Sequence, residues 1–300
     1  MINQATQTNL VKIYFFICQK FNDELQYNCL RFTNNDTPDF TDQEILTIYL
    51  FCVHFEQRFK IKDIHSFIRK YYSDWFPLLP SYPTFNTRLN RLSYVFQLLT
   101  ESLMKDFMPQ EYSENTSLID SMPIITCSGK RQGKVAKEIT DKSFCSTKNL
   151  YYYGVKLHAS AFRVKGHLPH PESIIVTKAS ENDLNAYKHY ISPIENRSFY
   201  GDKIYAHKEY FDNLYLQNNT EMLTPIKAIK GQPEALKLWD SAYNFQYSKA
   251  VSAIRQPIES FFNWLIEKTD IQRASKVRSK EGLQIHIFGK LAAAFLSFIF

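Results

Sequence analysis

Cysteine is scarce in this sequence, and its spacing argues against two kinds of stabilisation. The five cysteines of the 300 residues include no Cys-x-x-Cys pair: Cys18, Cys29, Cys52, Cys127 and Cys145. An odd number of widely spaced cysteines is typical of free thiols in a reducing compartment and not of a disulfide framework. Structural zinc sites commonly use closely spaced cysteine pairs, so we expect none here. These absences favour a cytoplasmic protein.

Long apolar runs and targeting segments are also missing. No uncharged apolar stretch reaches the roughly 18 residues of a membrane span, so we expect no membrane partner. The first residues lack the charged and small-residue parts of a secretory signal. The chain has no internal repeat and no low-complexity tract. With 44% hydrophobic and 15% aromatic residues, it is instead predicted to fold around a large core, divided between two units.

Positive charge is unevenly distributed along the chain. Residues 1–112 carry 11 Lys/Arg and 12 Asp/Glu, whereas residues 113–300 carry 25 Lys/Arg and 18 Asp/Glu. The excess that gives the net charge of +6 therefore lies in the second part. A basic surface of this kind suits a polyanion such as double-stranded DNA, although many proteins of similar charge bind no nucleic acid.

The first unit, residues 1–112, is predicted to be helical. Thr41 and Glu44 have the spacing of a capping box before an apolar run to Phe55, and residues 60–72 form a second helical stretch. A long helix is expected from Pro83, with one apolar stripe: Phe85, Leu89, Leu92, Phe96, Leu99 and Leu103. Its polar side carries Arg88 and Arg91. This region is either a helix-turn-helix that reads DNA through these arginines or a helical bundle with a solvated face.

The second unit, residues 113–300, changes pattern. Strands are expected at 117–125, 151–160, 173–177, 197–201 and 222–226, with helices at 181–191 and 207–217 between the later ones. A further helix follows around residue 259. This element order predicts an RNase H-like fold, a mixed α/β sheet flanked by helices. Residues 128–150 are predicted to be a basic loop or insertion.

Three acidic residues stand in settings that suit cation binding. Asp120 and Asp202 end short strand-like runs, and Glu259 lies in a helix-like segment after Pro257. Hard divalent cations prefer carboxylate oxygens, and a pair of such ions about 4 Å apart can activate a hydroxyl and stabilise the leaving oxygen of a phosphodiester. Each acid taken alone could equally be a turn former, a helix cap or a solvated side chain.

Several phrases around these acids resemble one family. They are Ile119-Asp120-Ser121-Met122-Pro123, Tyr153-Gly154-Val155-Lys156-Leu157-His158, Arg255-Gln256-Pro257-Ile258-Glu259 and the run from Arg278 to Ile287, with Trp75-Phe76-Pro77 and Leu79-Pro80-Ser81-Tyr82 nearer the front. Their order and spacing are similar to those of DDE transposases of small bacterial insertion sequences. The chain departs from the family's fuller pattern at Ser252 and Ile266, where many relatives carry Tyr and Lys, so no role is carried over to these two residues.

The resemblance implies a function and a cofactor. Asp120, Asp202 and Glu259 would be the catalytic metal ligands for Mg²⁺ or Mn²⁺, with two ions bound. The protein would cleave DNA at the ends of the element, exposing a 3′-hydroxyl, and that hydroxyl would attack target DNA. A homodimer on DNA is expected because two ends must be joined. Two alternatives stay open: a metal-dependent nuclease without strand transfer, and a non-catalytic DNA-binding protein derived from a transposase.

Basic residues around these acids are the candidate DNA contacts. Arg255 precedes Glu259 by one helical turn, and is expected to contact a phosphate or to form a local ion pair. Lys156 and His158 share one face of a strand and could face DNA or be structural. The remaining candidates lie in the basic insertion and before the last helix: Lys130, Arg131, Lys134, Lys276 and Arg278.

Overall fold

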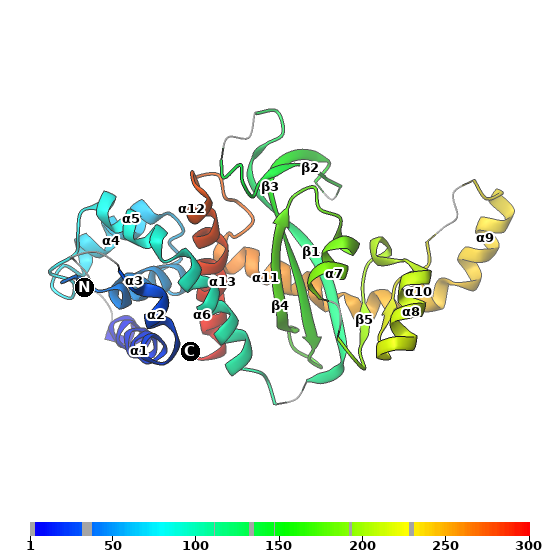
Figure 1. The fold of residues 1–300 in the computed structure, drawn as a ribbon, viewed down its shortest axis with the longest axis horizontal. Helices are drawn as coiled ribbons and strands as arrows, with labels where there is room; N and C mark the ends of the chain where they lie inside the picture. The colour runs from blue at the N-terminus through cyan, green and yellow to red at the C-terminus, as the bar shows by residue number, and fades with distance from the viewer. Residues whose placement is uncertain are drawn as a thin grey trace.

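The computed structural model describes residues 4–31, 38–110, 112–131, 135–146, 148–191, 194–227 and 231–300. Over these residues the molecule is elongated, with helices at one end, a sheet in the middle and one helix projecting at the other end (Figure 1). The predicted mixed α/β class with a helical N-terminal region is confirmed.

The N-terminal region is a cluster of helices. Their bounds are α1 Gln4–Lys20, the π-helical turn η1 Phe21–Leu25, α2 Gln26–Cys29, α3 Asp42–His54, α4 Ile61–Tyr71, α5 Tyr82–Arg91 and α6 Ser93–Asp106. The predicted capping box begins α3: the Glu44 backbone N–H donates to the Thr41 hydroxyl, and the Thr41 N–H donates to the Glu44 carboxylate. These paired bonds satisfy donors that a helix start would otherwise leave without partners.

The single long helix predicted from Pro83 is two helices in the structure. α5 ends at Arg91 and α6 begins at Ser93, with Leu92 at φ −83° and ψ 12° between them. All six residues of the predicted apolar stripe are nevertheless buried. The buried face is confirmed and the length is wrong, because a one-residue break keeps the stripe in phase and leaves no trace in the apolar spacing.

Six strands of the described residues form one mixed sheet. They are β1 Ser113–Ser128, β2 Asp141–Cys145, β3 Leu150–Arg163, β4 His170–Lys178, β5 Ser198–Tyr200 and β6 Glu221–Leu223. β4 pairs with β3 and β3 with β1 in antiparallel fashion, while β1–β5 and β5–β6 are parallel. Three antiparallel strands followed by parallel strands that alternate with helices are consistent with the predicted RNase H-like architecture.

The basic segment 128–150 is not a loop throughout. β1 continues to Ser128, and β2 pairs with the start of β3 between Asp141↔Gly154 and Cys145↔Leu150. The loop prediction is therefore wrong for these strand residues. Cys145 is the one buried residue of β2, so an exposed edge strand of this kind carries no apolar periodicity from which to predict it.

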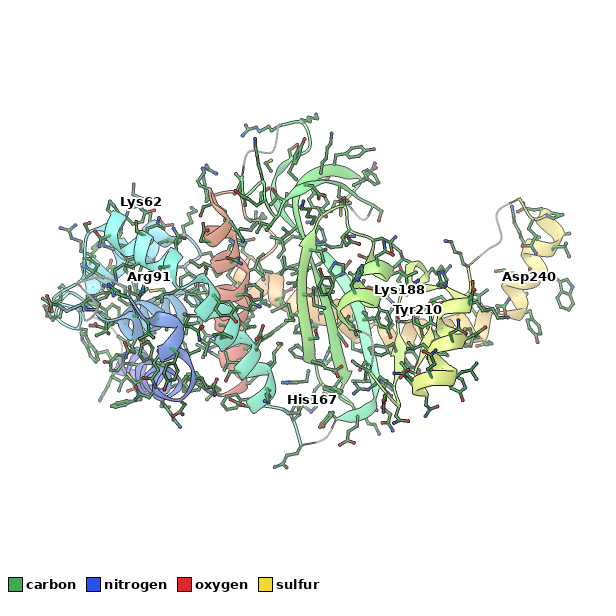
Figure 2. The ribbon with its side chains drawn as sticks, viewed as in Figure 1. Lys62, Arg91, His167, Lys188, Tyr210 and Asp240 are labelled. Atoms are coloured by element: carbon green, nitrogen blue, oxygen red, sulfur yellow. The ribbon has the colours of Figure 1, made fainter. Side chains whose placement is uncertain are left out.

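Helices cover both faces of the sheet. They are α7 Asp183–Tyr190, the 3₁₀ turn η2 Lys203–Tyr205, α8 Lys208–Asn218, α9 Glu234–Tyr243, α10 Phe245–Arg255 and α11 Pro257–Thr269. Ile119 and Phe199 pack with α7 and α8 on one side. Leu118 and Leu157 belong to the main core, which α11 joins through Ile258. α9 has no buried residue and projects from the end of the molecule, where Figure 2 labels Asp240.

The C-terminal helices return to the N-terminal cluster. They are α12 Lys280–Gln284, the π-helical turn η3 Ile285–Gly289, α13 Lys290–Phe295 and the 3₁₀ turn η4 Leu296–Phe298. α13 lies beside α6 in Figure 1, and the Thr100 hydroxyl donates to the Phe288 carbonyl over 3.0 Å. One core thus continues across the predicted boundary between residues 112 and 113, and the division into two domains stays a prediction. No helix of the described residues has the length and apolarity needed to span a bilayer.

Candidate active site

Strand register places Asp120 and Asp202 at matching positions. β1 and β5 run parallel, and the last paired residues are Leu118 and Tyr200. Asp120 and Asp202 each follow two residues later, one on β1 and the other just beyond the end of β5. Neighbouring strands are about 4.8 Å apart, and residues two apart on a strand share a face. The pairing therefore brings the two predicted acids to one side of adjacent strands.

A glycine allows the turn that carries Asp202. A Cβ atom on Gly201 would lie 2.8 Å from the Tyr205 ring and 3.0 Å from the Met222 sulfur. Only glycine leaves room for Tyr205 to pack against this backbone. Asp202 is exposed, and its carboxylate accepts the Lys203 backbone N–H over 2.6 Å, which caps η2 and fixes the direction of the acid.

Arg255 connects the other two acids. It is the last residue of α10, and its guanidinium donates to an oxygen of Asp120 over 2.8 Å although the two residues are 135 positions apart. The same guanidinium donates to Glu259, which lies in the first turn of α11 after Pro257. The Arg255 side chain is 15% exposed and Glu259 is 51% exposed. The local ion pair expected for Arg255 is present. A contact with a DNA phosphate is also compatible with this geometry, because Glu259 beside Arg255 is exposed to solvent.

The carboxylates at this site repel one another. The Asp120 side chain is 23% exposed, and burial raises its pKa to about 6 against the opposing pull of Arg255 and the Ser121 N–H, with Asp183 and Asp202 raising it further. Burial acts to lower the pKa of Arg255, but Asp120, Glu259 and Asp202 hold it above its usual value. Asp120 and Arg255 are therefore each influenced by several charged neighbours, and burial is the largest cause of the raised pKa of Asp120.

Asp183 is a fourth acid at this site, which the sequence patterns did not single out. It is the first residue of α7 and accepts hydrogen bonds from the Ser121 hydroxyl over 3.1 Å and from the Lys156 ammonium over 2.9 Å. Ser121 directly follows Asp120, so Asp183 supports the strand that carries the first predicted acid. An Asp near a predicted helix start is commonly explained as a residue that stabilises the helix end. Asp183 therefore did not stand out from the other acids in the sequence.

Lys156 and His158 have partners inside the protein. The Lys156 ammonium also donates to the Glu181 carbonyl over 2.7 Å. The His158 ring is 1% exposed, shares a hydrogen bond with the Thr177 hydroxyl over 2.8 Å, and has its pKa lowered to about 4 by burial. A buried neutral ring does not reach DNA, so the DNA contact predicted for His158 is corrected to a structural role. The predicted alternation is confirmed, since Val155 and Leu157 lie in the core.

Tyr205 is a buried polar group facing the acids. Its ring is 1% exposed, and its hydroxyl has no hydrogen-bond partner among the described residues. Burial raises its pKa well above the usual value, and Asp183, Asp120 and Asp202 add to that effect. A buried hydroxyl without a partner is costly, and the described residues offer Tyr205 no such partner.

The donor set fits a divalent cation in its chemistry. Among the described residues, no three His, Cys, Asp or Glu side chains already stand as a metal-binding group. Asp120 and Glu259 share one guanidinium, which occupies the space between them. Carboxylate oxygens in this number suit Mg²⁺ or Mn²⁺. A shift of the Arg255 side chain would free both acids for such an ion.

The remaining candidate DNA contacts fall into three groups. Lys130 and Arg131 are exposed after β1, and Lys134 lies outside the described residues. Arg88 and Arg91 both donate to Asp42, a residue that is 7% exposed, and Figure 2 labels Arg91 among the N-terminal helices. Arg88 is only 13% exposed, so its place in this ion pair is structural. Lys276 and Arg278 line a cavity against the N-terminal helices.

One comparison with known proteins identifies the family of the chain. The family model described as a transposase DDE domain matches residues 111–296, more than half of the chain. None of the curated proteins and none of the solved structures matches it. The matched range contains all three predicted acids together with Arg255, Asp183 and Tyr205.

Proposed function

Because the chain belongs to the transposase DDE domain family, we propose that it is a DNA transposase that cuts the ends of an insertion sequence and joins them to target DNA. Asp120, Asp202 and Glu259 are the proposed catalytic acids. The observation that carries the proposal is the convergence of these three residues on Arg255 and on the parallel edge between β1 and β5.

Three different elements of the fold carry the proposed catalytic acids. Asp120 sits on a rigid central strand, Asp202 on a capped turn, and Glu259 on a helix start, so their oxygens approach from three elements. Divalent cations, two by the family resemblance, would supply Lewis acidity that activates the attacking hydroxyl and stabilises the leaving 3′-oxygen. No side-chain nucleophile is needed. Arg255, released from the two acids, would be free to bind a DNA phosphate.

The proposed partners are double-stranded DNA, first the element ends and then the target, and a second copy of the chain. Lys130 and Arg131 are exposed next to the strand that carries Asp120, which suits contact with the backbone of an end. All five cysteines are unpaired, which is compatible with the proposed cytoplasmic location.

A strand-transfer assay tests the proposal. The purified protein is incubated with Mg²⁺ and a duplex that ends in the DNA flanking the gene, either intact or pre-cleaved, and with a target plasmid. Asp202→Asn is expected to lower joining at least about 100-fold, since the loss of groups that only support metal ligands already costs about 10–100-fold. The matched control is Glu267→Gln, an exposed acid further along α11, which should retain full activity.

The outcomes separate the alternatives. Nicking with Mg²⁺ but no joining of pre-cleaved ends would replace the proposal with a nuclease. Duplex binding that survives Asp120→Asn, with no metal-dependent product from the wild type, would indicate a non-catalytic DNA-binding protein. Equal loss of joining in Asp202→Asn and Glu267→Gln would refute the assignment of the acids.

A further inference from the structure

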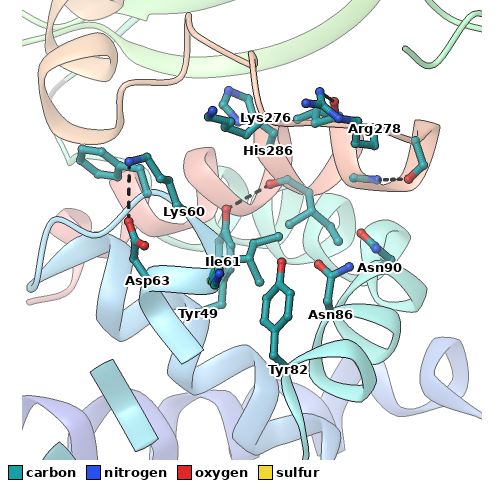
Figure 3. Close-up of a pocket in the computed structure, with 16 residues that line it drawn as sticks. Tyr49, Lys60, Ile61, Asp63, Tyr82, Asn86, Asn90, Lys276, Arg278 and His286 are labelled. Atoms are coloured by element: carbon teal, nitrogen blue, oxygen red, sulfur yellow. Dashed lines mark hydrogen bonds and ion pairs between the residues drawn. The ribbon is translucent and has the colours of Figure 1, made fainter. Parts of the chain in front are cut away.

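A basic groove lies between the N-terminal helices and the segment after α11. It has a volume of about 440 Å³, within the ~300–1,000 Å³ usual for ligand sites. One wall is the start of α4, a second is the polar face of α5, and the third is the segment 276–279 with the start of α12 (Figure 3). The two sides of the groove therefore come from parts of the chain about two hundred residues apart.

The charges of this groove are largely free of acidic partners. Lys60 and Lys62 line the groove from the start of α4, and Lys276 and Arg278 line it from the segment after α11. Asp63 is the acidic lining residue, and it pairs with Lys60 at 3.8 Å. Among the described residues, no carboxylate lies within ion-pair distance of the other three cations. Positive charge contributed by two separate walls suits an extended anion better than a single small one.

The groove also offers neutral polar groups between its cations. Asn86 and Asn90 lie one helical turn apart on α5, and Tyr82 stands at the start of the same helix (Figure 3). The side-chain NH₂ groups of these asparagines and the Tyr82 hydroxyl are hydrogen-bond donors. Amide and hydroxyl groups of this kind complement lysines in contacts to phosphate and sugar oxygens.

The walls are held in place by bonds between distant segments. Ile125 of β1 donates its N–H to the Gln272 carbonyl over 2.8 Å and accepts the Ala274 N–H over 2.9 Å, which ties the chain before Lys276 to the sheet. At the floor, the buried Tyr49 hydroxyl donates to the Ile285 carbonyl over 3.3 Å. These contacts keep the groove formed without a ligand, so an anion would bind to a preformed site.

We propose that this groove binds the sugar–phosphate backbone of double-stranded DNA, with Lys62 and Lys276 contacting phosphates from two different walls. This inference rests on the proposed function, since it supplies a holding site for the same DNA away from the catalytic acids. Binding requires the lysines of both walls. The N-terminal helices and the segment after α11 therefore hold DNA jointly, and neither forms the site by itself.

The test is binding of a fluorescent duplex of mixed sequence to the full chain, measured by anisotropy at several salt concentrations and without divalent metal. The double variant Lys62→Ala/Lys276→Ala is expected to reduce the slope of log K against log salt by about 2, since each phosphate contact contributes about 0.9. Lys12→Ala, an exposed lysine on α1, is the matched control and should leave the slope unchanged. An unchanged slope in the double variant, or an equal change in the control, would overturn the proposal.

A second measurement keeps the test valid if the double variant does not fold, and it distinguishes DNA from a small anion as the ligand. A photo-crosslinking side chain at Asn86 should attach to the duplex, and one at Lys12 should not; no attachment at Asn86 counts against the groove. Inorganic phosphate that protects the wild type from heat, with no duplex attachment at Asn86, would make this a small-anion site instead. Because neither readout needs cleavage, loss of the groove and loss of the proposed catalysis are distinguishable.

Discussion

Two clusters of ion pairs in this molecule have opposite compositions. In the N-terminal region, the carboxylate of Asp42 accepts from three arginines, Arg31, Arg88 and Arg91, and is 7% exposed. Beside the central strand β1, the single guanidinium of Arg255 donates to two carboxylates, Asp120 and Glu259.

The difference in composition separates structural from functional charge. Around Asp42, donors outnumber acceptors and the acid lies inside a shell of guanidinium groups, which is a way to bury a charge with its partners. Around Arg255, acids are in excess, and Asp202 and Asp183 add to the repulsion. An excess of carboxylates that the protein itself does not neutralise is expected where a cation is to bind. Three predictions test this contrast: the first compares the two clusters directly, and the other two examine the Arg255 cluster.

The largest expected effect is on stability. Asp42→Asn removes the negative charge from three clustered arginines and should lower the free energy of unfolding by about 3–5 kcal/mol, the usual cost of breaking a buried ion pair. Asp120→Asn should not lower it, and above pH 6 should raise it by up to about 2 kcal/mol, because burial keeps the pKa of Asp120 raised despite the contact with Arg255. Urea denaturation of both variants measures this. A larger loss for Asp120→Asn than for Asp42→Asn would reverse the contrast.

The pH dependence of Asp120 gives the next effect. Its folded pKa of about 6 lies above the usual 3.8, so between these values the folded chain binds more protons than the unfolded chain. Stability should therefore fall as pH rises from about 4 to 6 and remain lower above 6. The loss is about 2 kcal/mol, taking about 1.4 kcal/mol per pKa unit and allowing for partial exposure. The difference between wild type and Asp120→Asn, measured by urea denaturation without metal, isolates it; a difference independent of pH would contradict the prediction.

The smallest expected effect is on metal binding. Arg255→Ala leaves Asp120 and Glu259 without their shared cation, so Mg²⁺ should bind the DNA-free protein about tenfold more tightly, equivalent to about 1.4 kcal/mol. Calorimetric titration with Mn²⁺ or Mg²⁺ measures this without any activity. The control is Arg273→Ala, since Arg273 is 77% exposed and pairs with Asp270 away from the acids. Weaker metal binding in Arg255→Ala would show that Arg255 supports the ions and does not compete with them.

Sequence patterns were informative where each residue reports its own surroundings. The alternation of Val155 and Leu157 with Lys156 and His158 predicts which face of β3 joins the main core, because side chains on a strand alternate between faces, although His158 on the other face is also buried. The capping box at Thr41 predicts the start of α3, because its bonds are local. The same spacing that predicts the stripe from Phe85 to Leu103 cannot show the break at Leu92, because the break preserves the phase.

The residues of the candidate site could not all be predicted from local sequence patterns. Asp183 and Tyr205 carry no local signal, and they join the acids only because α7 and η2 pack beside the end of β5. The ion-pair partners of the arginines could not be predicted from the sequence either. Arg88 and Arg91 lie on the polar face of their helix region, as DNA contacts would, but the fold places Asp42 against them. Whether a cation is free or paired depends on which distant acid the tertiary packing brings to it.

By itself, the amino-acid sequence determined the mixed α/β class and the excess of positive charge after residue 112, and it predicted the three acids, which lie within the matched family range. Only the tertiary structure decided that Arg255 stands between Asp120 and Glu259, that Asp183 accepts a hydrogen bond from Ser121, and that Lys62 and Lys276 line one groove. The reason is physical. Periodicity and caps arise from bonds between near neighbours, whereas the charge balance of a site depends on side chains that meet only after the sheet and its helices have packed.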